Sequence, residues 1–178
     1  LIGIGGLLAF APLAYLFRAA RNRRRDLPQI ALISAAIGAV GFGVGQAITR
    51  TSYYVGAANF EDSADRSNSA AGDALNNSGV VTGGLIAQIG QIALAVAFAL
   101  VSLNAMRVGL LTRFQGVLGM IVGATLILPL DQFGLIRSAW LLLAGLLILS
   151  IWPRQRPPAW ETAEAVPWPS QQQIREER

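Results

Sequence analysis

Four polar side chains set in long apolar runs are the residues of this sequence best placed to form a site. They are Gln46, Gln88, Gln91 and Thr125. If the runs are membrane-spanning helices that alternate in direction, all four lie at a similar depth below one surface. We consider two interpretations, a polar vestibule or ligand pocket, and hydrogen bonds that hold helices together at about 0.6 kcal/mol each.

Two further residues, Asp131 and Arg137, are six positions apart across a predicted turn and are candidates for an ion pair. No acidic residue falls near the middle of any apolar run. Ion-coupled carriers usually need a carboxylate at that depth, because its charge couples proton or ion binding to a conformational change. The pattern therefore argues against a secondary transporter or pump.

Other catalytic and ligand-binding chemistry finds little support in the composition. The chain has no cysteine and no histidine, which removes thiolate nucleophiles, histidine bases and most zinc or copper sites. Asp62 and Asp65 lack both a partner of defined geometry and the spacing of an EF-hand. The glycines at 41–45 lie inside an apolar run with no strand before them, unlike a nucleotide-binding loop. We predict no catalytic residue, no metal and no cofactor.

The apolar runs themselves indicate how the chain is organised. Hydrophobic residues make up 53% of 178 positions and charged residues 13%, about half the charged fraction of a soluble domain. We predict an all-α, polytopic transmembrane helical bundle, of which the third helix is long enough to tilt or protrude. It has about five spans, at roughly 1–17, 28–49, 80–106, 114–130 and 135–152. Because the chain begins inside an apolar run, we also expect residues upstream and allow for a sixth span.

The arginines predict the orientation of these spans. Five of them fall in the connector 18–27, and arginine-rich connectors face the cytoplasm. Alternation then places 107–113 and 153–178 in the cytoplasm and 50–82 outside, with 11 arginines on the inner side and three on the outer side. All basic residues are arginine, which we read as the coding bias of a GC-rich bacterial genome. The predicted location is the bacterial plasma membrane, with the lipid bilayer and no nucleic acid as partner.

The predicted domains are a transmembrane domain over 1–152 and a cytoplasmic tail over 153–178. Residues 50–82 are rich in Ser, Asn, Ala and Gly and net negative, which predicts a long, flexible extracytoplasmic loop with Ser78 capping the next helix. In the tail, prolines flank a predicted short helix. We expect Trp152, Trp160 and Trp168 to contact lipid headgroups or a partner.

Small residues recur at helical spacing in the second and fourth spans. Such residues let helix backbones approach closely in lipid, where packing holds helices together. The interpretation is either packing within the chain or association with a second chain. The candidates are Ala39, Gly41, Gly43, Gly45, Gly119 and Gly123.

The segment from Asn104 to Arg113 and the tail motifs Pro-Pro-Ala-Trp-Glu (157–161) and Pro-Trp-Pro (167–169) support a further comparison. They resemble an uncharacterised family of actinobacterial multi-pass membrane proteins that has no assigned activity. The resemblance implies an organism class and no mechanism. From the residues we expect a non-enzymatic structural or accessory component that packs with itself or with a larger membrane complex. The alternative is a small channel or carrier that uses the four polar side chains at similar depth, Gln46, Gln88, Gln91 and Thr125.

Overall fold

The computed structural model describes residues 2–128, 130, 134–151, 157, 159–162 and 164–168, and its regular elements are all helices. The long helices are α1 (Ile2–Arg23), α2 (Ile30–Asp62) and α4 (Ser78–Arg107). The shorter ones are α3 (Asn68–Leu75), α5 (Arg113–Ile127), α6 (Leu135–Ile148) and α7 (Ala159–Thr162). The predicted all-α helical bundle is confirmed.

Three helices, α1, α2 and α4, are long and apolar enough to cross a membrane. The fourth and fifth predicted spans form the shorter apolar helices α5 and α6, of 15 and 14 residues. At 1.5 Å per residue these are about 22 and 21 Å long, against a hydrocarbon core of roughly 30 Å. Many of the large side chains that face away from the bundle are apolar, such as Ile37, Leu85 and Leu142. Lipid is the solvent that suits such a surface.

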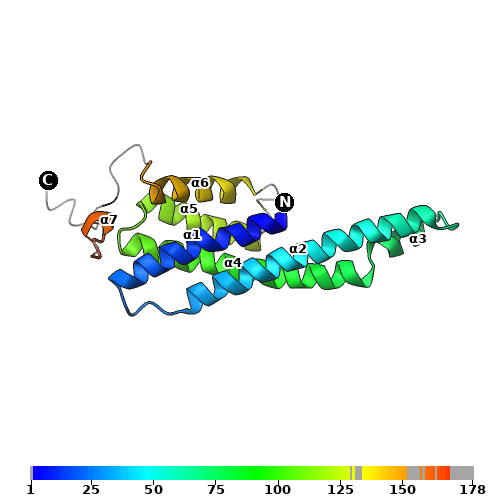
Figure 1. Cartoon of the computed structure of the whole chain (residues 1–178), viewed down its shortest axis with the longest axis horizontal. Coiled ribbons are helices and arrows are strands. Elements are labelled where there is room, and N and C mark those ends of the chain that lie inside the picture. Colours follow the sequence, from blue (N-terminus) through cyan, green and yellow to red (C-terminus); the bar gives the residue numbers. More distant parts are fainter. Residues whose placement is uncertain are drawn as a thin grey trace.

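The bundle is built around the halves of α2 and α4 that lie toward the α7 end of the molecule (Figure 1). There, α1, α5 and α6 pack beside them, and the remaining halves of α2 and α4 continue past the bundle as a two-helix arm. The bundle core combines Leu13, Phe17, Phe98 and Trp140 from three helices. The rings of Phe98 and Trp140 meet edge to face, with centroids 5.2 Å apart. Aromatic burial of this kind fixes α4 against α6.

The structure differs most from the sequence prediction in segment 50–82. In place of an irregular loop, α2 continues as helix to Asp62, and the short helix α3 returns beside it before α4 begins at Ser78. The polar composition predicted a flexible loop here. The segment is nevertheless helical because α2 is backed along its length by α4 and then by α3, and tertiary packing supplies most helical stability in proteins.

Local capping chemistry decides where α4 and α5 begin. Asn77, one residue before the predicted cap, accepts the Val80 N–H at 3.1 Å. Thr112 and Gln115 form a reciprocal capping box that starts α5. Each cap satisfies an amide that the first helical turn leaves without a partner. The turn between α4 and α5 is therefore tightly defined.

Candidate functional site

Among the described residues, the four polar residues of the predicted vestibule have different surroundings. Gln91 donates to the Leu126 carbonyl at 2.5 Å, and Thr125 donates to the carbonyl three residues before it at 3.0 Å. Gln88 is exposed on the outer face of α4, and Gln46 is half-buried on α2. None of the four is among the described residues that line the cavity presented below. Gln91 instead satisfies a carbonyl at the end of α5, where a helix leaves its last C=O groups without partners.

Arg137 lies in the first turn of α6 and is half-buried. Its guanidinium carbon sits 5.7 Å from the centroid of the Phe42 ring on α2. A cation over an aromatic face is attracted by the quadrupole of the ring. Asp131, its predicted ion-pair partner, lies outside the described residues. The observed contact thus ties α6 to α2 and was not predicted.

The small residues of α2 face α4 at backbone distance. A Cβ placed on Gly41 would lie 3.1 Å from the Gly90 Cα, and one on Gly45 would overlap the backbone of Ala87. Backbones this close gain dispersion energy over many atom pairs, which is how helices associate in lipid. The four predicted small residues of α2 are buried or half-buried: Ala39, Gly41, Gly43 and Gly45.

The two predicted glycines of α5 also face α4. A Cβ on Gly123 would lie 2.6 Å from the Ala95 carbonyl oxygen. One on Gly119 would overlap Ser102 and would lie 2.6 Å from the indole nitrogen of Trp140. These contacts use the small residues within the chain, so α4 is the helix against which both α2 and α5 pack.

Sequence reasoning missed the glycines that complete the interface from α4. A Cβ on Gly83 would lie 2.6 Å from the Thr49 amide nitrogen, and one on Gly90 would overlap Phe42. The signal was present, because Gly83 and Ala87 are four residues apart in an apolar run. The α2–α4 interface therefore joins small residues from both helices.

The arm formed by α2 and α4 begins near Arg50, the first charged residue after the apolar stretch of α2. Between Ile30 and Thr49, α2 has 20 residues without a charge, which is about 30 Å of helix and matches the hydrocarbon core. From Arg50 to Asp62 it continues for 13 residues, or about 20 Å. We call residues 50–77 and the first turn of α4 the projecting hairpin (Figure 1).

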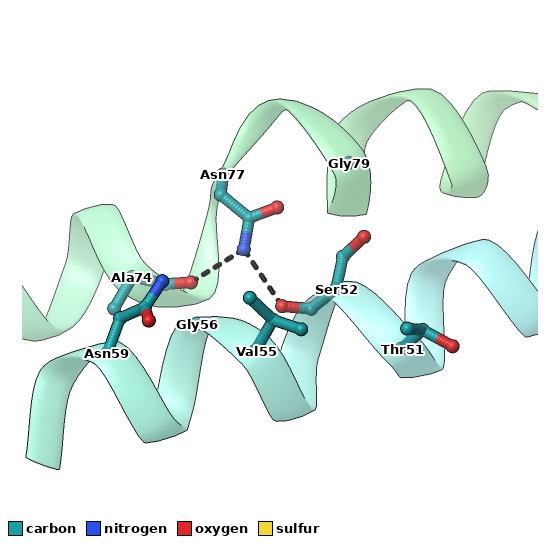
Figure 2. A pocket seen from close by; sticks show the side chains of 8 residues that line it. All are labelled: Thr51, Ser52, Val55, Gly56, Asn59, Ala74, Asn77 and Gly79. Carbon is teal, nitrogen blue, oxygen red and sulfur yellow. Dashed lines mark hydrogen bonds between the residues drawn. The ribbon is translucent and has the colours of Figure 1, made fainter.

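Asn77 locks the projecting hairpin at the point where its three helices meet (Figure 2). Its side-chain amide donates to the Ser52 carbonyl at 3.0 Å and to the Ala74 carbonyl at 2.9 Å. Its side-chain oxygen caps α4. Opposite, a Cβ on Gly56 would overlap the Ala74 carbonyl oxygen. One side chain thus holds α2, α3 and α4 in register.

A cavity of about 400 Å³ opens beside this lock. Figure 2 shows the residues around it, with Thr51, Val55 and Asn59 on successive turns of α2. Next to it, Tyr54 is 77% exposed, as expected for a ring at or beyond the headgroup level. The lining residues are Thr51, Ser52, Val55, Gly56, Asn59, Ala74, Asn77 and Gly79.

The projecting hairpin carries an excess of negative charge. Four carboxylates against two arginines leave a net charge of −2; they are Glu61, Asp62, Asp65 and Asp73 against Arg50 and Arg66. The Asp65 carboxylate accepts the Ser67 backbone N–H at 2.9 Å, which holds the pKa of Asp65 below its usual range. Within the described part of the chain, acidic side chains form no group of three that could hold a metal ion.

At the opposite end of the bundle, the described part of the tail docks on the connector between α4 and α5. Trp160 donates its indole N–H to the Leu110 carbonyl at 2.8 Å. Trp168 donates to the Leu111 carbonyl at 2.9 Å, and Arg23 donates to a carbonyl of α7 at 2.9 Å. We expected these tryptophans to contact headgroups or a partner, but their N–H groups bind this chain. Trp152 lies outside the described residues.

Comparison of this chain with known protein families, curated proteins and solved structures gives no match. The resemblance of the tail to an actinobacterial membrane family therefore stays a prediction. Two features bear on function. One is the geometry of the projecting hairpin, and the other is the opposite, arginine-rich end of the bundle, where α1 and α4 end and α5 begins.

Proposed function

We propose that this protein is a non-enzymatic structural or accessory component of the bacterial plasma membrane. It assembles with itself or with a larger membrane complex, and the projecting hairpin is the arm that makes the contact. The observation that carries this proposal is the continuation of α2 over the 13 residues from Arg50 to Asp62, backed by α3 and α4. A helical arm held by backbone contacts keeps its shape before a partner binds, which lowers the entropic cost of binding.

The placement of the polar side chains favours this function over transport. A channel or carrier needs polar groups that face a continuous path. Here Gln91 and Thr125 bind backbone carbonyls of the bundle, and Gln88 points outward from α4. Their hydrogen bonds therefore stabilise the helical packing.

In the proposed topology, the projecting hairpin lies outside the cell and the arginine-rich end lies in the cytoplasm. The ends of α1, α4 and α5 that carry arginine gather at one end of the bundle (Figure 1), as the positive-inside rule predicts. We propose that α5 and α6 provide the fourth and fifth crossings. Because they form a hairpin, connector 107–113 and tail 153–178 lie on the same side whether α5 and α6 cross the bilayer or only enter it.

Photo-crosslinking in intact cells tests the assembly. Benzoylphenylalanine replaces Tyr54, which is 77% exposed on the hairpin, and in the control replaces Phe114, which is 66% exposed at the arginine-rich end. We expect an adduct from position 54, with a mass that distinguishes a second copy from a different protein. A monomer without adducts from position 54, also after mild detergent extraction, would contradict the proposal.

Labelling with a membrane-impermeant maleimide tests the topology separately. The chain has no cysteine, so single cysteines report one position each. We expect Asp65→Cys to react in intact cells and Arg25→Cys to react only after the membrane is opened. The reverse pattern would overturn the orientation without bearing on the assembly.

A further inference from the structure

The cavity beside the Asn77 lock is not used by the assembly proposed above. Along α2 it is lined by Thr51, Val55 and Asn59, whose spacing of four residues places them on one face of the helix. From Thr51 to Asn59 the helix advances eight residues, or about 12 Å. Figure 2 shows Ser52, Val55 and Asn59 pointing from α2 toward α3 and the start of α4. The cavity therefore extends along α2, and the other two helices form its second wall.

Three polar side chains of the lining have hydrogen-bonding groups that the chain does not use. Within the described part of the chain, the hydroxyls of Thr51 and Ser52 and the amide of Asn59 form no hydrogen bond. A Cβ on Gly79 would overlap the Ser52 Oγ, so the glycine leaves room for that hydroxyl. Asn77 differs, because its side chain donates and accepts within the lock. Hydroxyl and amide groups both donate and accept, so they match a ligand whose groups do the same.

The charge around the cavity disfavours an anionic ligand. The described residues that line it are uncharged, and the projecting hairpin that carries it has a net charge of −2. The carboxylates of the hairpin repel an anion. Among the described residues they form no group that could hold a metal ion. An uncharged ligand is the one that suits these surroundings.

The cavity begins at the level of the lipid headgroups. Thr51 lies two residues beyond Ile30–Thr49, the charge-free stretch of α2 that matches the hydrocarbon core. Headgroups add roughly 5–8 Å on each side of that core, so the near part of the cavity lies among them and the far part lies above them. Between the two, Val55 is 53% exposed and offers an apolar patch, which small-molecule sites combine with a few polar groups.

We propose that this cavity binds an uncharged, hydroxyl-rich ligand, which is the sugar headgroup of a glycolipid or a free saccharide. Thr51, Ser52 and Asn59 exchange hydrogen bonds with sugar hydroxyls, and Val55 packs against the carbon face of the ring. The lock through Asn77 holds both walls in place before the ligand arrives, which lowers the entropic cost of binding. The site requires only that the projecting hairpin stands outside the hydrocarbon core, so a hairpin without a protein partner still binds sugar.

Native mass spectrometry of the full chain in lauryldimethylamine oxide, a detergent without sugar, measures the binding. The probes are monoglucosyl dioleoylglycerol, dioleoylglycerol with the same acyl chains and no sugar, and the anionic lipid dioleoylphosphatidylglycerol. We expect the glucosyl lipid to bind most tightly. Thr51→Val and Asn59→Leu keep a similar side-chain size and remove the polar groups. Each change lowers the association constant of the glucosyl lipid about fivefold.

Matched controls make the same two changes outside the cavity. Thr82→Val on α4 and Asn68→Leu at the start of α3 alter exposed residues of the same region, and we expect less than a twofold effect. Maltose as a competitor separates the two sources of sugar. Displacement of the glucosyl lipid by millimolar maltose shows that a free saccharide is sufficient, and retention of the lipid shows that its anchor is required. Both results support a sugar site.

Three results would overturn the proposal. Equal binding of the glucosyl lipid and dioleoylglycerol would show that the sugar makes no contact. Tighter binding of phosphatidylglycerol than of the glucosyl lipid would indicate a site for an anion. Equal effects of the cavity variants and their controls would place the bound sugar elsewhere on the chain. Circular dichroism of each variant checks that the helices are intact.

Discussion

Replacing Gly90 with alanine tests whether backbone contact between α2 and α4 holds the structure together. The added Cβ would overlap the Phe42 amide nitrogen, and it would lie 2.5 Å from the Gly41 carbonyl carbon and 2.9 Å from the Phe42 Cα. Ordinary van der Waals contact begins at 3.4 Å, so the helices must move apart by at least about 1 Å (3.4 minus 2.5). All three clashing atoms are backbone, which no rotamer change can relieve. Overpacking of this kind costs about 1–3 kcal/mol.

The same substitution at Gly84 provides the control. Gly84 is on the same helix, but a Cβ there meets nothing within 4 Å. Both substitutions gain the same intrinsic helix propensity of alanine over glycine, about 1 kcal/mol in water. The difference between the two variants therefore isolates the steric cost, and we expect Gly90→Ala to be less stable than Gly84→Ala by about 1–3 kcal/mol.

The assay is reversible unfolding of the full chain in mixed maltoside and dodecyl sulfate micelles, followed by far-ultraviolet circular dichroism. Free energies of unfolding are compared at the same detergent composition. If Gly90→Ala and Gly84→Ala unfold at the same midpoint, α2 and α4 do not pack at backbone distance and the argument for a rigid arm fails.

Three further predictions follow from single contacts. Asn77→Ala removes a helix cap, worth about 0.5–2 kcal/mol, and two carbonyl contacts, so amide exchange across residues 50–77 accelerates while exchange in α5 is unchanged. Gln91→Leu leaves a carbonyl of α5 without a partner and destabilises the fold by about 0.6–1.7 kcal/mol, whereas Gln88→Leu on the exposed face does not; equal effects would refute this role. The hydrogen bond and charge of Arg24 lower the pKa of Asp26, so this pair stabilises the folded chain above the unfolded pKa of 3.8 and is lost as pH falls through the lower folded value. Carboxyl NMR titration checks this shift, which Arg24→Gln should reduce because it removes the largest of its causes.

Hydropathy and charge along the chain were sufficient for the fold class. Apolar runs of helical length predicted the bundle, and the small residues of α2 and α5 were recognised from spacing alone. These features are local: a helix in lipid must satisfy its backbone internally, so length and apolarity are enough to predict it. The arginines likewise predict an orientation because they act through their position next to each run.

The contacts between helices depend on the tertiary structure and could not be predicted from the sequence. Residues 50–62 were predicted to form a loop because their composition is polar. They are helical because α3 and α4 pack against them. The four polar side chains were predicted to form one site because their depth can be counted from the sequence. The direction in which each side chain faces depends instead on the rotation of its helix. Gln88 consequently faces outward and Gln91 faces α5.

The sequence by itself thus determined the fold class, the apolar parts of its helices and the charge difference between its two ends. Only the tertiary structure decided which surfaces meet: α2 against α4 through facing glycines, Asn77 across three helices, and the tail against the connector that carries Arg107 and Arg113. The physical reason is the separation along the chain over which each interaction acts. Hydropathy and helix propensity act between neighbours in the chain, while close packing and hydrogen-bond geometry act between residues that only the fold brings together.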